Sequence, residues 1–380
     1  MQCEDPDSAR HRLEASAPKL METRKLGLRC TTVTEQSSPY LPLKVKMAEE
    51  RVLVAAVEAG GTTWVAALAW EDDMGAPFER IEVPTTTNPA ETISAVRDWL
   101  RKQVAAHPVR AVGVASFGPI DPKPESPTYG HITSTPKPGW GNTDVVGGLG
   151  LGPTGEFASL PHRFDTDVNG PALAEFIADC NNSSGSGGGS DANASSSNSS
   201  SSSAYVTVGT GVGAGLVVNR RTVAGLLHPE AGHIPVRRKI GDDYAGCCPF
   251  HGDCLEGMVC SRAIAERAGV PASELAGLED SHPVWDSAAY YLAQLAVNMV
   301  LLASVEKVVF GGGIFNRSCL YDKIRSHVST LLNGYIQVPA LTTKEGLQGY
   351  VARSRWGLQA GLIGAVFLAV DALKSKQVKA

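Results

Sequence analysis

The sequence predicts an α/β protein built from two related halves around a cleft. The main observation is a repeated unit in which a buried strand, a glycine-rich turn and a second strand follow one another. This unit spans residues 51–70 and recurs across 204–218, and each copy precedes further strand and helix patterns. A chain of 380 residues is also long enough for two domains, each with its own core.

The elements of the first half follow from the spacing of apolar residues. Branched and small apolar residues predict strands, and apolar residues at helical spacing predict a helix. The expected strands are 51–57, 62–70, 111–115 and 163–167, and the expected helices are 93–105 and 171–180. We place a domain boundary after residue 164, so that 49–164 form a smaller domain.

The second half repeats this order with longer helices. After the strands 204–208 and 213–218, a long helix over 287–304 leads into a strand over 307–310. Three glycines, 311–313, end that strand. An apolar helix over 357–373 closes the chain, and we expect it to complete the smaller domain, leaving 165–356 as the larger one.

Two segments have compositions that do not predict a core. Residues 1–48 lack the apolar stretch of a signal peptide and carry acidic residues that are unusual in a transit peptide, so we expect a disordered extension. Residues 181–203 are almost wholly serine, glycine and asparagine, which predicts a disordered insert because such residues bury little apolar surface.

Charge and cysteine content narrow the function classes. A net charge of −5 and 43% hydrophobic residues favour neither a nucleic-acid partner nor a membrane surface. We expect no apolar run long enough to span a bilayer. Eight cysteines without a paired framework favour a reducing compartment, so we expect a cytoplasmic protein.

A cluster of cysteine and histidine predicts a metal site. Cys248, His251 and Cys254 lie at intervals of three residues, and His233 lies upstream. Two thiolates and two imidazoles suit tetrahedral Zn²⁺, and a complete protein shell indicates a structural ion. The alternative is a pair of buried thiols beside surface histidines, and Cys247 could replace Cys248 as the ligand. The segment 233–254 would then be a zinc knuckle that anchors two carboxylates at its ends, Glu230 and Glu256.

The two glycine turns are candidate phosphate-binding loops. Glycine lets the backbone approach an anion closely, so that amides and hydroxyls can reach phosphate oxygens. Either turn alone could be only a hairpin connection, but one in each half favours a phosphate clamp across a cleft. Neither turn is followed by the lysine of a Walker loop, and neither opens a helix as a dinucleotide fingerprint does. The candidate residues are Gly60, Gly61, Thr62 and Thr63 in the first turn, and Gly209, Thr210 and Gly211 in the second.

Two carboxylates follow the strand at 163–167. Asp165 and Asp167 would point to the same side if the strand persisted, and Asn169 follows them. A carboxylate at a strand end can accept the proton of a sugar hydroxyl while that oxygen attacks a γ-phosphate. The alternative is an aspartate that caps the next helix.

Taken together, these motifs resemble the ROK family of sugar kinases, and within it the fructokinase branch. The resemblance covers about residues 52–373. Glu58 and the cysteine–histidine knuckle mark the branch, whereas Thr63 departs from it because fructokinases often carry lysine there. The motifs are Glu58–Thr62, Ser134–Asp144, Asp165–Asn169, Gly209–Gly213, His228–His233, Cys248–Gly257 and Gly311–Ile314.

The resemblance implies a two-domain actin/hexokinase-like (ribonuclease H-like) ATPase fold with an interdomain cleft, dependent on ATP and Mg²⁺. It implies phosphorylation of D-fructose at the 6-hydroxyl, with Asp167 as general base. The glycine turns would hold phosphates, and Gly311, Gly312 and Gly313 would lie along the adenosine end. The residues implied for the sugar are Asn142, Asp144, Asn169, Glu230, His233 and Glu256, although Asn142 and Asp144 taken alone favour a turn-forming role.

Three alternatives stay open at this point. A mannokinase or a broad hexose kinase would differ only in a few hydrogen bonds to the sugar. A sugar-responsive regulator would carry a DNA-binding domain, and the N-terminal extension shows no helix-turn-helix pattern. We expect a hexose and ATP as the binding partners, and the sequence leaves a homodimer open.

Overall fold

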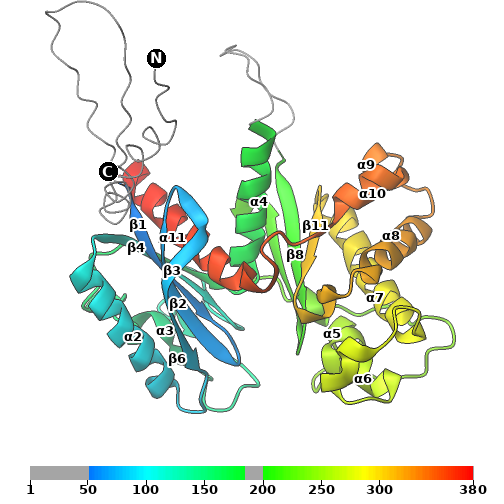
Figure 1. The fold of residues 1–380 in the computed structure, drawn as a ribbon, viewed down its shortest axis with the longest axis horizontal. Coiled ribbons are helices and arrows are strands. Elements are labelled where there is room, and N and C mark those ends of the chain that lie inside the picture. The colour runs from blue at the N-terminus through cyan, green and yellow to red at the C-terminus, as the bar shows by residue number, and fades with distance from the viewer. Residues whose placement is uncertain (1–50, 185–199, 380) are drawn as a thin grey trace, which may run out of the picture.

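The structure is a computed structural model that describes residues 51–184 and 200–379. The extension predicted over 1–48 lies outside the described residues. Two five-stranded sheets stand side by side, each flanked by helices, with the chain passing between them (Figure 1).

The first sheet has the order β3-β2-β1-β4-β7. Its first three strands pair antiparallel, and β1 pairs parallel with β4, which pairs parallel with β7. The strands are β1 (Leu53–Ala59), β2 (Thr63–Trp70), β3 (Asp73–Pro84), β4 (Val109–Ser116) and β7 (His162–Thr166). The domain boundary predicted after residue 164 falls inside β7. Because β7 pairs with β4, the first sheet extends to Thr166.

The second sheet repeats this pattern in the order β10-β9-β8-β11-β12. Three strands again pair antiparallel, and two parallel strands follow on the other side of β8. The strands are β8 (Ser202–Val208), β9 (Val212–Val218), β10 (Arg221–Thr222), β11 (Val308–Gly311) and β12 (Val351–Arg353). The matching orders are the structural counterpart of the repeated strand–glycine–strand unit in the sequence.

Helices cover both faces of the first sheet. Alternate residues of β1 face opposite sides, as the pleat of a strand requires: Leu53, Ala55 and Val57 pack toward α2, and Val54 and Ala56 pack toward α11. The helices are α2 (Pro89–Ala106) and α11 (Ala360–Lys379). A short hairpin of β5 (His131–Ile132) and β6 (Thr143–Asp144) and the helix α3 (Val145–Gly148) lie in the connection between β4 and β7.

The second sheet has one helix on one face and a helical layer on the other. Phe176 of α4 packs against Tyr205, Val217 and Val309 of the sheet. The opposite face packs against a larger core to which α7 contributes many side chains. The helices are α4 (Asn169–Ser184), α5 (Leu255–Val259), α6 (Ser261–Ala268), α7 (Pro283–Ala303), α8 (Cys319–Leu332), α9 (Pro339–Thr342) and α10 (Lys344–Tyr350).

The predicted insert is too long at both ends. Residues 181–184 belong to α4, and Ser202 and Ser203 are buried in β8. These serines pair with Val218 and Val217 of β9. Pairing with the neighbouring strand therefore places them in the sheet, although serine has no strong preference for strands. Residues 185–199 lie outside the described part of the chain.

The last helix corrects a second expectation. Residues Gly357–Ser375 are long and apolar enough to cross a membrane by length and composition, although the sequence was expected to contain no such run. In the structure 67% of this stretch is buried, packed against β1, β4 and α4. The chain therefore ends in a core helix that contacts both halves.

Candidate active site

Asp167 lies in the turn between β7 and α4, where the first sheet passes into the second half. Its amide donates to the carbonyl of Ser116 at 2.9 Å, and its side chain is half-buried. Burial, followed by the negative charges of Glu58 and Glu230, raises the pKa of Asp167 to about 7. Carboxylates from β1, the β7–α4 turn and the loop after β10 therefore act on one region, which is suited to a general base near neutral pH.

Glu58 is a site residue that the sequence interpretation used only as a family marker. It is the last but one residue of β1, directly before the first glycine turn. Burial raises its pKa to about 7 against the opposing charge of Arg80 and the hydrogen bond from the Leu362 amide. The carboxylate packs against Gly361, where a Cβ atom would lie 2.1 Å from Oε1. A carboxylate at a strand end beside a glycine turn was the available signal.

Glu230, His233 and Glu256 form the other side of this group. Burial and the charge of Glu256 raise the pKa of Glu230 to about 7. Glu256, in the first turn of α5, accepts a hydrogen bond from the Val212 amide at 2.9 Å through Oε2. Its Oε1 lies 4.0 Å from Nε2 of His233. These contacts bring three of the predicted sugar-binding residues next to the second glycine turn.

The predicted metal ligands come together. The ligand atoms of His233, Cys248, His251 and Cys254 all lie within 4.8 Å of one another. Nδ1 of His233 is 3.7 Å from the sulfur of Cys248 and 3.6 Å from that of Cys254. Tetrahedral bonds of about 2.3 Å to sulfur and about 2.0 Å to nitrogen would place such atoms about 3.5–3.6 Å apart, so the geometry fits Zn²⁺.

The two nitrogens of His233 face different groups. Nδ1 faces the two cysteine sulfurs, and Nε2 faces Glu256. The Cys247 sulfur instead lies 3.4 Å from that of Cys260, outside the four-ligand group. The geometry therefore favours Cys248 over Cys247 as the ligand.

Both glycine turns expose their tips. Gly61 and Thr62 are exposed between β1 and β2, and Thr210 is exposed between β8 and β9. Within the described residues, none of these three amides donates to another backbone group. The flanks are fixed: the Gly60 amide donates to the Thr63 carbonyl at 3.2 Å, and Gly209 to Gly211 at 2.9 Å. Backbone amides that have no acceptor, held in place by a fixed turn, can donate hydrogen bonds to an anion.

Three glycines, of which Gly311 ends β11 and Gly312 and Gly313 follow it, differ in role. Gly312 has φ 86°, and a Cβ atom there would lie 2.5 Å from the Val208 carbonyl oxygen. Gly313 is exposed with open space beside it. Gly311 is buried, and a Cβ atom there would lie 2.6 Å from the Tyr205 hydroxyl. Packing therefore explains Gly311, whereas Gly313 leaves room for a ligand.

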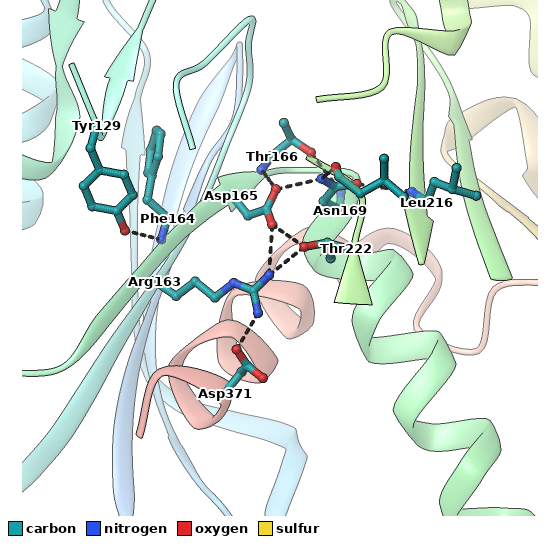
Figure 2. Close-up of polar contacts among 10 residues, drawn as sticks. Tyr129, Arg163, Phe164, Asp165, Thr166, Asn169, Leu216, Thr222 and Asp371 are labelled. Carbon is teal, nitrogen blue, oxygen red and sulfur yellow. Dashed lines mark hydrogen bonds and ion pairs between the residues drawn. The ribbon is translucent and has the colours of Figure 1, made fainter. Parts of the chain in front are cut away.

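The structure contradicts the prediction that Asn169 binds sugar. The residue is fully buried, and its Nδ2 donates to Asp165 at 2.8 Å (Figure 2). The same nitrogen donates to the Val223 carbonyl at 3.4 Å. Its Oδ1 accepts from the Leu216 amide at 3.2 Å. Asn169 therefore stabilises the start of α4, and its side chain has no exposed surface that a substrate could contact.

Asp165 and Asp167 also differ from the expected alternation. The strand ends at Thr166, so the period of two does not reach Asp167. The Asp165 side chain is buried and accepts from the Thr222 hydroxyl at 2.9 Å and from Arg163 at 3.4 Å (Figure 2). This carboxylate is enclosed by protein, which leaves Asp167 as the candidate base.

Asn142 and Asp144 have local roles. Asn142 adopts φ 57° in the loop before β6, and Asp144 accepts from the Gly147 amide at 2.7 Å as the N-cap of α3. Asp144 also lines a cavity of about 570 Å³ beside α2. Among the described contacts, none joins either residue to the carboxylates around Asp167. In the structure, the observed contacts of Asn142 and Asp144 are therefore those of turn and capping residues.

His228 is a second residue that the sequence interpretation did not assign. Its Nε2 accepts from the Ile120 amide at 3.0 Å, so the imidazole joins the loop after β4 to the loop that carries Glu230. Burial lowers the pKa of His228, which favours the neutral ring that this acceptor role requires. The signal in the sequence was its place at the start of the histidine–proline–glutamate motif.

Comparisons with known proteins identify the family to which this chain is related. A model of the ROK family matches residues 54–372. The chain is 37% identical to a fructokinase of Pediococcus pentosaceus over 328 residues, which cover 85% of this chain and 100% of that protein. It is 36% identical to a fructokinase of Zymomonas mobilis subsp. mobilis over 329 residues, covering 86% and 99%.

A solved ROK hexokinase from Thermus thermophilus has the same fold, with a TM-score of 0.61 and 23% identity over 85% of this chain and 100% of that one. The chain therefore belongs to the ROK family. The predicted family and its two-domain actin/hexokinase-like fold class are confirmed.

Proposed function

We propose that the protein is an ATP-dependent hexose kinase whose principal substrate is D-fructose, phosphorylated at the 6-hydroxyl. The observation that carries this proposal is the half-buried carboxylate of Asp167, whose pKa is raised to about 7, in a chain with two glycine turns whose tip amides, at Gly61, Thr62 and Thr210, donate to no backbone group of the described residues. Relatives named fructokinase at 36–37% identity support the choice of sugar.

In this proposal the sugar hydroxyl donates its proton to Asp167 while its oxygen attacks the γ-phosphorus of ATP. The bond to the β,γ-bridging oxygen breaks, and ADP leaves. The exposed amides of Gly61, Thr62 and Thr210 bind phosphate oxygens. The open space beside Gly313 leaves room for the adenosine end, and Gly312 lets the chain lie close to Val208. Mg²⁺ bound to the phosphates of ATP supplies neutralisation of their charge.

The sugar is held by Glu230, His233 and Glu256. For Asn142 and Asp144, whose contacts in the structure are local, only the family resemblance supports a role in holding the sugar. The zinc knuckle has a structural role in this proposal. Four protein ligands leave no open position on Zn²⁺, so its contribution is to fix the loop that carries Glu230, His233 and Glu256.

Substrate choice is tested by measuring ADP release with fructose, mannose, glucose and N-acetylmannosamine. We expect fructose to have the highest kcat/KM, by about tenfold or more, since a few hydrogen bonds to hydroxyls can discriminate by that much. Equal turnover of mannose or glucose would overturn the fructose assignment alone. No turnover of any of the four sugars would overturn the kinase proposal.

The base is tested by Asp167→Asn. General-base catalysis contributes about 10²–10⁴-fold, so we expect kcat to fall by that order while the Kd for ATP stays within about threefold. The measurement is steady-state kinetics together with calorimetric titration of ATP. A variant that keeps wild-type kcat would show that another group accepts the proton.

A further inference from the structure

Five residues form a polar network where the two halves meet, and we call it the interdomain clamp: Arg163, Asp165, Asn169, Thr222 and Asp371. Arg163 and Asp165 lie on β7, an edge strand of the first sheet, and Thr222 lies on β10, an edge strand of the second. Asn169 begins α4, and Asp371 belongs to α11 (Figure 2). The clamp therefore joins both sheets and both helices that lie between them.

The clamp is centred on the Asp165 carboxylate, which is 4% exposed and accepts four hydrogen bonds. Oδ1 accepts from the Thr166 amide at 2.9 Å and from Asn169 Nδ2 at 2.8 Å. Oδ2 accepts from the Thr222 hydroxyl at 2.9 Å and from Arg163 at 3.4 Å. The same hydroxyl accepts from Arg163 at 2.6 Å. Thr222 is thus the residue of the second sheet that bonds directly to Asp165, whereas Leu216 of β9 reaches Asp165 only through Asn169.

Arg163 extends the clamp to the C-terminal helix. Its guanidinium pairs with Asp371 of α11 as well as with Asp165. Most of Arg163 is buried, and a buried guanidinium depends on such partners. Removing either carboxylate would leave the guanidinium with a single carboxylate partner, so the position of Arg163 depends on both Asp165 and Asp371.

The turn that carries Asp167 is held on both sides by this network. Before it, the Thr166 amide donates to Asp165; after it, the Asn169 amide donates to the Thr166 hydroxyl at 2.9 Å. The Asp167 amide itself donates to Ser116 on β4. The three bonds fix the backbone on each side of the candidate base.

We propose that Asp165 is a positioning residue for Asp167, and that Thr222 makes this position depend on the second sheet. The inference rests on the proposed function, in which Asp167 accepts the proton of the sugar. Asp165 is enclosed and touches no substrate; its role is to hold the β7–α4 turn. Misplacing a reacting group by about 1 Å costs on the order of 10²-fold in rate, so the effect belongs in kcat.

The test variant is Thr222→Val, which removes the hydroxyl and keeps the shape of the side chain. We expect kcat to fall by about 10- to 100-fold with KM for ATP within about twofold, and Thr222→Ser to restore kcat to within about threefold. Asp165→Asn should lower kcat further, because one amide oxygen replaces two acceptors. The matched control is Ser202→Ala, which removes a buried hydroxyl of the same sheet that donates to the Ser304 carbonyl at 3.2 Å. Its kcat should equal that of the wild type.

Hydrogen exchange gives a readout that needs no turnover. In Thr222→Val the amides of Thr166, Asp167 and Asn169 should exchange about tenfold faster or more, and in Ser202→Ala they should be unchanged. The proposal would be overturned if Thr222→Val had the amide exchange rates and the kcat of the wild type. It would also be overturned if Thr222→Val and the control Ser202→Ala lost kcat to the same extent. If the wild type phosphorylates no sugar, the proposed function fails, and the exchange rates still decide whether the clamp holds the turn.

Discussion

Asp165 and Asp167 are two residues apart, yet their carboxylates have different surroundings. Asp165 accepts bonds from Arg163 and a hydroxyl, whereas Asp167 is near the negative charges of Glu58 and Glu230. The sequence indicated the pair and favoured Asp167 as a candidate base, but it did not predict that the two carboxylates have different surroundings. The end of β7 at Thr166 decides it, because the alternation of a strand stops where the strand does.

The raised pKa of Asp167 predicts how activity depends on pH. A base must be ionised, so kcat should rise with pH and level off above about 7, the pKa of Asp167. Glu230→Gln removes one of the two negative neighbours that raise this pKa, and should move the midpoint to lower pH by about 0.5–1. The pH profile of kcat measures the shift. Glu345→Gln, which removes an exposed charge on α10, is the control, and an equal shift there would contradict the assignment.

At the scale of elements, the sequence predicted the helices and strands that have a clear apolar spacing. It missed features that depend on contacts with residues distant in the chain. Apolar spacing predicted the strands around both glycine turns. It also predicted the long helix over 287–304, which the structure shows as α7. The edge strand β3 was missed, because its residues alternate between exposed and half-buried without a strong apolar pattern. Asn169 was misassigned because its partners, Leu216 and Val223, lie more than 40 residues away in the chain. The clustering of the four candidate metal ligands was predicted because three of them are close in sequence.

The zinc knuckle should affect the sugar more than the nucleotide. We expect metal analysis of the purified protein to give about one equivalent of zinc per chain, and Cys254→Ser to lose it. Because Glu230 and Glu256 flank the knuckle, that variant should raise KM for sugar or unfold, with nucleotide affinity less affected in any folded fraction. Cys247→Ser, whose sulfur faces Cys260, should keep its zinc. Full activity and unchanged Tm in a metal-free enzyme would contradict a structural role.

The middle of the serine-rich segment and its C-terminal end should respond differently to replacement. Exchanging 185–199 for a short glycine–serine linker should leave Tm and kcat nearly unchanged, since loop closure costs grow slowly with length. Extending the exchange to 203 should lower Tm, because Ser202 and Ser203 are buried in β8 and paired with β9. Thermal unfolding of both variants compares them. Equal Tm values would show that this end of β8 contributes nothing to stability.

On the scale of the whole molecule, α11 makes the two halves one structure. It covers the first sheet at the close approach to Gly113 on β4, where a Cβ atom would lie 1.9 Å from the Ala365 carbonyl oxygen. It crosses α4 of the second half at Gly364, where a Cβ atom would lie 2.4 Å from the Pro171 nitrogen. The last helix in sequence thus fixes the place of the first sheet relative to α4, a relation that no local pattern could predict.

Gly364→Ala should therefore disturb the arrangement of the halves more than either half alone. The added methyl group meets backbone atoms of Gly170 and Pro171, which cannot rotate away, so α4 and α11 must separate. Overpacking of this kind costs about 1–3 kcal/mol, and we expect a Tm lower by several degrees, on the order of 2–4 °C per kcal/mol. Because α4 begins two residues after Asp167, kcat should also fall. Gly349→Ala in α10, where a Cβ atom meets nothing within 4 Å, is the matched control and should leave both values unchanged. A Gly364→Ala enzyme with wild-type Tm and kcat would show that the crossing of α4 and α11 tolerates the added methyl group, and that the position of the base does not depend on it.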